Sequence, residues 1–161
     1  MYFTSIVVSA LAAAGLASAS PASRGSKRGP CLSQPPSSIG FPINYNISSA
    51  SSPFASFLIP PNSVGPCTLV AKFPAGYPVS TAGNPLVDFV DVNGPAAGSV
   101  VGTAHLQSSP TQATKTFINS FACRDVMAYQ LKLAPQEGSN EWVAFQEIQG
   151  VGLFMEVGDS C

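Results

Sequence analysis

The segment from Met127 to Leu133 reads MAYQLKL, and apolar side chains alternate in it with small or polar ones. Positions 127, 129, 131 and 133 are large and apolar, whereas 128, 130 and 132 are alanine, glutamine and lysine. Successive side chains of a β-strand point to opposite faces, so this period of two places the apolar set on one face. The segment therefore predicts a strand that covers a core.

Seven more segments fit short strands, and the stretches between them are rich in glycine, proline, asparagine and serine, which favour turns. They are FASFLI (54–59), CTLVAKF (67–73), LVDFVDV (86–92), SVVGTAHL (99–106), KTFINSFAC (115–123), EWVAFQEIQ (141–149) and VGLFMEV (151–157). The segment 141–149 also fits a helical spacing, and we favour a strand. The pattern predicts an all-β fold, a disulfide-stapled antiparallel β-sandwich of about eight strands.

Composition limits the classes of function. The chain has 161 residues, which suggests one domain. Only 9% of its residues are charged, against about 25% in an average protein. This composition is not that of a highly charged, intrinsically disordered chain. The sequence also lacks the clustered lysine and arginine that bind nucleic acid.

The N-terminal region predicts export. Residues 1–19 resemble a signal peptide, because an uncharged apolar run is followed by Ala17-Ser18-Ala19, with cleavage after Ala19. The alternative is a buried apolar helix. Residues 20–28 are a candidate propeptide that ends at the dibasic pair Lys27-Arg28, which could instead be two solvated charges. We expect a secreted protein of the extracellular space or cell wall, without a membrane span.

The mature chain would then have two parts. Residues 29–53 are rich in proline and serine and predict an extended arm, with a short edge strand near 41–47. Residues 54–161 form the predicted sandwich domain. Four basic and eight acidic residues remain after position 28, for a net charge of −4. This charge would keep the domain soluble and away from anionic partners.

Four cysteines follow the predicted cut sites, and an even number in a small secreted chain indicates two disulfides. Strand phase places Cys67 with Leu69, and Cys123 with Phe117 and Phe121, so both sulfurs should point into the core between two packed sheets. Cys31 and Cys161 remain, near the mature termini. Of three connectivities we predict 67–123 and 31–161. There is no C-x-x-C pair, so we expect no zinc site, and no cofactor motif is present.

Two features concern glycans. The sequon Asn46-Ile47-Ser48 lies in a polar, loop-like stretch and predicts N-glycosylation of Asn46. Trp142, Tyr77 and Tyr129 could together form a platform on which a sugar stacks. Tyr129 is in phase with core residues, however, and single aromatic residues in a small sandwich usually fill the core.

The sequence indicates no catalytic residues. His105 is the only histidine, no G-x-S-x-G motif is present, and the C-terminal GDSC has no strand–turn–helix to present its serine. We expect a surface or hydrogen-bonded histidine. Asp88 and Asp91 are three apart, which in a strand places them on opposite faces. Glycoside hydrolysis needs two carboxyl groups that face one sugar about 5–10 Å apart.

From Phe54 to Cys161 the chain resembles the fungal ubiquitin 3 binding protein C-terminal domain family, of which it looks like a small secreted member. The resemblance rests on FLIP (57–60), C-x-L-x-x-x-F-P (67–74), F-x-x-x-F-x-C (117–123), the following strand with Tyr129, and GVGLFMEV (150–157). It implies a disulfide-stapled β-sandwich and supplies no catalytic residue. The family name suggests an intracellular ubiquitin-like partner, but a signal peptide and disulfides argue against one here.

The sequence thus predicts a monomeric, secreted, non-enzymatic protein that binds an extracellular protein or a cell-wall glycan, with an effector-like role included. The alternative is a small acid glycoside hydrolase that uses a carboxylate pair.

Overall fold

The computed structural model describes residues 30–38, 40–135 and 140–161. The predicted signal peptide, the propeptide and the processing residues Ala19, Lys27 and Arg28 lie outside these ranges. The described residues form eleven strands and no helix. The strands are β1 (Leu32–Gln34), β2 (Ile43–Ser48), β3 (Phe54–Leu58), β4 (Pro66–Phe73), β5 (Val79–Ala82), β6 (Val87–Asp91), β7 (Val100–Ala104), β8 (Thr114–Ala122), β9 (Val126–Leu133), β10 (Trp142–Glu147) and β11 (Gly152–Val157).

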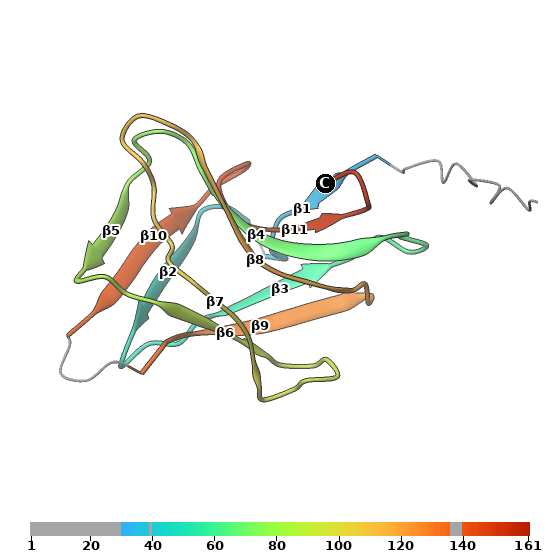
Figure 1. Cartoon of the computed structure of the whole chain (residues 1–161), viewed down its shortest axis with the longest axis horizontal. Coiled ribbons are helices and arrows are strands. Elements are labelled where there is room, and N and C mark those ends of the chain that lie inside the picture. Colours follow the sequence, from blue (N-terminus) through green and yellow to red (C-terminus); the bar gives the residue numbers. More distant parts are fainter. Residues whose placement is uncertain (1–29, 39, 136–139) are drawn as a thin grey trace, which may run out of the picture.

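The strands make three antiparallel sheets. Sheet A has the order β1-β11-β4-β8, sheet B the order β2-β10-β5, and sheet C the order β3-β9-β6-β7. Sheet A packs on both of the others (Figure 1). The ring of Phe73 on β4 meets that of Phe145 on β10 at 5.3 Å, and the ring of Phe121 on β8 meets that of Tyr129 on β9 at 5.4 Å. The predicted all-β sandwich with two disulfides is confirmed.

All eight predicted strands are present, and the ambiguous segment 141–149 is the strand β10. The edge strand expected near 41–47 is β2, which pairs along its whole length with β10. Two strands were not expected. β1 has three residues and β5 has four, and both are largely exposed, so neither shows an apolar alternation. Residues 29–53, expected as an arm, therefore contribute two strands to the sheets.

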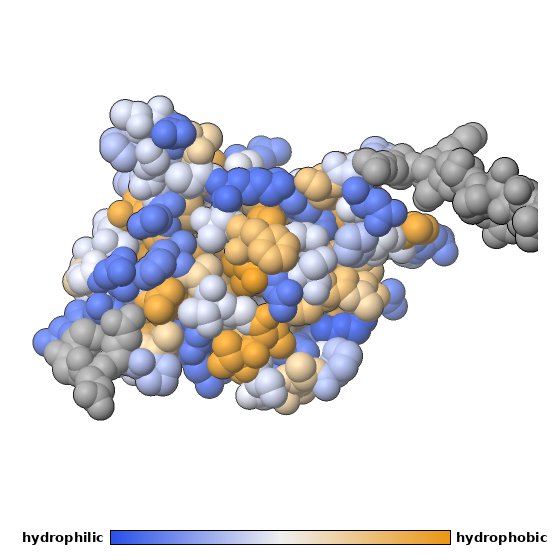
Figure 2. Space-filling model, viewed as in Figure 1, coloured by the Kyte–Doolittle hydropathy of each residue, from blue (hydrophilic) through white to orange (hydrophobic). Residues whose placement is uncertain are grey.

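The inward orientation predicted for Phe117 is wrong. The pairing of β8 with β4 is irregular at this point: Leu69 is opposite Asn119, and the next residue, Val70, is opposite Phe117. Ile118 is the extra residue of this β-bulge, and a bulge reverses the phase of the strand beyond it. Ile118 is consequently buried, while Phe117 is 63% exposed. Figure 2 shows apolar surface over the region where Figure 1 draws β7 and β8.

The predicted disulfide pairing is confirmed, but the predicted placement between two sheets is wrong. Cys31 is bonded to Cys161 and Cys67 to Cys123. Cys67 lies on β4 and Cys123 directly follows β8, which is the neighbour of β4 in sheet A. Cys31 directly precedes β1, and β1 pairs with β11 in the same sheet. Both bonds lie at one end of sheet A, because Val157 on β11 is opposite both Leu32 and Cys67.

No helix in the described part of the chain is long and apolar enough to cross a membrane.

Candidate functional site

The outer face of sheet B holds the main candidate surface. On β2, Tyr45 and Ile47 are buried while Asn46 is exposed. On β10, Val143 and Phe145 are buried, whereas the residues that alternate with them, among them Trp142 and Ala144, face outward. The register sets Ser48 opposite Trp142 and Asn46 opposite Ala144. These four side chains therefore share one outward face, two from each strand.

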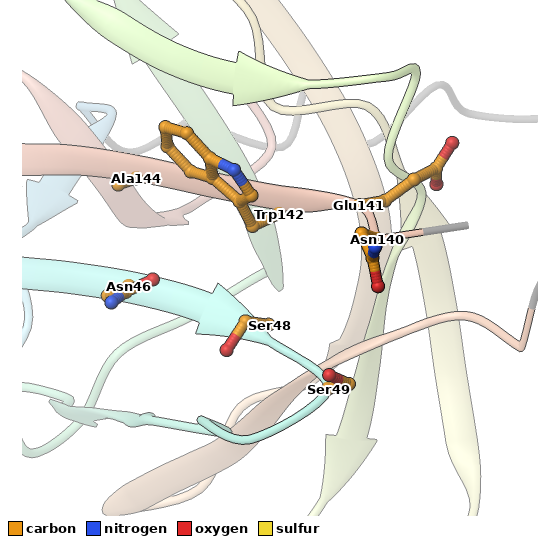
Figure 3. Close-up of a pocket in the computed structure, with 7 residues that line it drawn as sticks. All are labelled: Asn46, Ser48, Ser49, Asn140, Glu141, Trp142 and Ala144. Atoms are coloured by element: carbon orange, nitrogen blue, oxygen red, sulfur yellow. The ribbon is translucent and has the colours of Figure 1, made fainter.

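An open pocket of about 470 Å³ lies on this face. Its lining comes from the two strands and the residues beside them: Asn46, Ser48, Ser49, Asn140, Glu141, Trp142 and Ala144. Figure 3 shows these side chains, with the indole of Trp142 standing above the sheet next to Ala144. Trp142 is 37% exposed, so part of its indole is open to solvent. It is also the only tryptophan in the sequence.

The carboxylate of Glu141 points away from the rest of the pocket (Figure 3). Its Oε1 accepts a hydrogen bond from the backbone N–H of Asn84, at 3.2 Å, beyond the end of β5. Gly83 makes room for it, because a Cβ there would lie 2.7 Å from Oε1. Glu141 therefore fixes the loop after β5. The polar groups that remain on the pocket side are the amides of Asn46 and Asn140 and the hydroxyls of Ser48 and Ser49.

The sequon lies in a strand rather than in the loop that its polar neighbours predicted. Asn46 is in β2, which is an edge strand of sheet B. The following turn is closed by two backbone hydrogen bonds between Ser48 and Ser51. The loop prediction is wrong because alternate residues of this stretch, Tyr45 and Ile47, are apolar and buried. Asn46 itself is exposed, as a glycosylated residue must be.

The structure does not bring the three aromatic residues of the expected platform together as a surface. Tyr129 is buried and packs between Phe57 and Phe121. Tyr77 stacks on Phe73, and its hydroxyl donates a hydrogen bond to the backbone carbonyl of Gln146. Of the three, Trp142 alone lines the described pocket on sheet B.

The polar residues considered for catalysis have structural partners. The ring Nδ1 of His105 is 3.0 Å from the carbonyl oxygen of Pro85, which makes it the hydrogen-bonded histidine that was expected. Asp88 accepts a hydrogen bond from the hydroxyl of Thr103. Asp91 is buried and accepts hydrogen bonds from the backbone N–H groups of Gly94 and Ala96, so it holds the β6–β7 loop.

Glu147 has the most perturbed carboxyl group, yet it does not form a site. Burial raises its pKa from 4.5 to about 8, against the opposing effect of a hydrogen bond from the backbone N–H of Leu153 to Oε2. Such a pKa often marks a catalytic acid. Here the side chain is fully buried on the inward face of β10, where no substrate can reach it. Within the described residues there is also no cluster of three or more potential metal ligands.

The sequence alone could not reveal this pocket. Its aromatic residue and its sequon are 96 positions apart, and only the pairing of β2 with β10 joins them. Ser49 and Asn140 had no motif to single them out. Comparison of the chain with protein-family models, with curated proteins and with solved structures found no match.

Proposed function

We propose that the chain is a secreted, non-enzymatic glycan-binding protein of the extracellular space or cell wall, and that the pocket at Trp142 binds the glycan. The main supporting observation is an exposed indole on a sheet face, with amide and hydroxyl groups beside it. Ligand sites typically combine one apolar surface with a few polar groups that fix orientation.

The chemistry of the pocket matches a neutral sugar. A pyranose ring has C–H groups on its faces and hydroxyl groups around its rim. The indole of Trp142 offers a flat apolar surface for a face of the ring. The amides of Asn46 and Asn140 can both donate to and accept from the rim hydroxyls. Because the carboxylate of Glu141 is directed elsewhere, the pocket does not favour a cationic ligand.

Two disulfides support the extracellular location, since such bonds persist in oxidising compartments and are rare in the cytosol. The predicted signal peptide belongs to the same proposal. Membership in the fungal ubiquitin 3 binding protein C-terminal domain family is also proposed, and the all-β sandwich agrees with what that resemblance implies. An intracellular ubiquitin-like partner is not part of the proposal, because a reducing cytosol would open the disulfides.

The test is a depletion assay with insoluble chitin and insoluble β-glucan. The protein is made in a bacterial periplasm, which forms disulfides but adds no glycan at Asn46. We expect retention on one of the two polymers and a loss of at least about tenfold in affinity for Trp142→Ala, which corresponds to about 1.4 kcal/mol. Equal binding by Trp142→Ala and the parent would overturn the assignment.

A matched control is Phe54→Ala, because Phe54 is a 59% exposed aromatic residue on sheet C. This variant should bind as the parent does, and thermal unfolding should show that both variants are folded. Soluble reducing sugar in the supernatant would instead support the acid glycoside hydrolase.

A further inference from the structure

We infer that an N-glycan on Asn46 folds back onto Trp142, so that its first two sugars occupy the pocket and exclude other glycans. The contact between glycan and indole follows from the geometry of sheet B. Its consequence, that glycosylation controls ligand binding, rests on the function proposed above. Because the attached sugars fit the pocket, we expect the free ligand to be an oligosaccharide of β-linked N-acetylglucosamine.

The attachment point lies inside the pocket rather than near it. Asn46 is one of the lining residues, and its side chain is exposed on the outer face of β2. As an edge strand, β2 has no neighbouring strand on its far side within sheet B in the part of the chain that the structure describes. A glycan on Nδ2 therefore has room to leave the sheet without displacing any strand.

The spacing suits one sugar ring between the asparagine and the indole. Asn46 is opposite Ala144, and Trp142 is two residues from Ala144 on the same strand and face. Diagonal neighbours of this kind lie about 7–8 Å apart in an antiparallel pair. The methyl group of Ala144 fills little of the space above the sheet between them (Figure 3). A larger side chain at 144 would block this path.

The chemistry of the attached sugar matches the pocket. Every N-glycan begins with two β-1,4-linked N-acetylglucosamine units, which is also the repeating structure of chitin. The pyranose face can lie on the indole, and the acetamide can exchange hydrogen bonds with Ser48 and Asn140. A pocket that accepts the attached pair is thus suited to the same pair in a free polymer.

Attachment favours the linked glycan over a free glycan of equal affinity. A group held by a short flexible linker has an effective concentration in the millimolar range. To enter the pocket, a free oligosaccharide must be present above this effective concentration or bind more tightly than the attached sugars do. Glycosylated protein should therefore bind little chitin, whereas protein that lacks the Asn46 glycan should bind it.

Fluorescence tests the contact directly, because Trp142 is the only tryptophan. Protein from a eukaryotic host is compared with Asn46→Gln and Ser48→Ala from the same host, and mass spectrometry measures the occupancy of Asn46. We expect acrylamide to quench the glycosylated parent at least about twofold less than either variant, since the sugar covers the indole. Equal quenching, or an unoccupied Asn46, would overturn the inference.

A relocated glycan is the matched control. Val64 is 82% exposed, and Val64→Thr completes a sequon at Asn62. Figure 1 places this β3–β4 loop on the side of the molecule opposite the start of β10. The double variant Ser48→Ala/Val64→Thr should be glycosylated at Asn62, and it should match Ser48→Ala alone both in quenching and in binding to chitin. Shielding of the indole by the relocated glycan would contradict a specific contact.

The two proposals fail in different ways. If the glycan protects Trp142 from quenching but no form binds chitin or β-glucan, the proposed function fails and the contact stands. If unglycosylated protein binds chitin and the glycosylated parent binds it equally, the proposed function stands and the present inference fails.

Discussion

Glu147 is a carboxylic acid in a hydrophobic core. Its side chain has no exposed surface, and its Oε1 has no hydrogen-bond partner among the described residues. Burial raises the pKa of Glu147 to about 8, so the group is neutral in the folded protein over most of the acidic and neutral range. Burial, followed by the proximity of Glu147, also raises the pKa of Tyr45 above its ordinary value. Ionisation of Glu147 would leave an unpaired charge among apolar residues.

The folded protein should lose stability as pH rises through the window between the two pKa values of Glu147. In the unfolded chain this group loses its proton near pH 4.5, and in the folded chain only near about 8. Between these values the folded state binds more protons, so the free energy of unfolding falls by up to about 1.4 kcal/mol per pH unit. Urea unfolding from about pH 5 to 8 measures this slope.

Glu147→Gln is the matched variant for this slope, since the amide is neutral at every pH and keeps the shape of the side chain. The slope should disappear, and the variant should be more stable than the parent at about pH 8. An unchanged slope would show that another group titrates. Glu156 does not obscure the test. Burial raises its pKa, but the ammonium groups of Lys115 and Lys72 outweigh burial and lower it, so its contribution is lost only at lower pH.

Gly152 is required beside this carboxyl group. Its φ is +121°, and a Cβ there would lie 2.5 Å from Cγ of Glu147. Gly152→Ala should cost about 2 kcal/mol or more, since it adds steric overlap to backbone strain of about 1–3 kcal/mol. Gly150→Ala is the control, because its φ is +85° and no atom of the described residues lies within 4 Å of the Cβ position. Equal urea midpoints for the two variants would contradict a clash with Glu147.

At the scale of the strand, the sequence predicts where a strand forms better than it predicts which of its residues face the core. A strand with one buried face shows its alternation in the sequence, and β9 does so along its whole length. β8 does not, because the bulge at Ile118 reverses which residues face the core. Nothing in KTFINSFAC marks that position, since a phenylalanine and an isoleucine stand side by side. Phase is decided there by the partner strand.

Because of the bulge, two neighbouring substitutions should differ strongly in their effect on the free energy of unfolding. Ile118→Ala should lower the free energy of unfolding by about 2–5 kcal/mol, because it removes buried methyl groups. Phe117→Ala should change it by about 0.5 kcal/mol or less, because the ring is mostly exposed. Urea unfolding of the two variants compares them directly. The reverse order would indicate that Phe117 rather than Ile118 faces the core, as the sequence alone suggests.

At the scale of the whole molecule, the sheets join segments that lie far apart in the chain. The side-chain hydrogen bond from Gln146 to Asn44 spans 102 residues. Local patterns predict strands and core faces, but they contain no information on which strands become neighbours. The predicted disulfides were correct because few pairings exist for four cysteines, although the cross-sheet geometry argued for them was not. The candidate pocket needed the β2–β10 register itself.

Removal of each disulfide should destabilise the fold. In the chain-entropy model, links across 130 and 56 residues are worth about 4–5 kcal/mol each, as upper values. Cys31→Ser/Cys161→Ser should cost less than that, because β1 is a three-residue edge strand whose detachment exposes little core. Cys67→Ala/Cys123→Ala should cost more than the first pair of substitutions, because Cys67 is fully buried. Unfolding free energies of both pairs test this order, and a greater loss from the first pair would contradict it.

The position of the Cys31–Cys161 bond also determines how the molecule responds to mechanical load. The bond joins the residue just before the first strand to a residue four positions after the last strand. Tension applied between these two ends passes through one covalent bond and bypasses every strand between them. Under a pull the sandwich neither lengthens nor unravels until the bond is reduced. The domain therefore behaves as an inextensible link, in which a redox reaction rather than force decides when the sheets come apart.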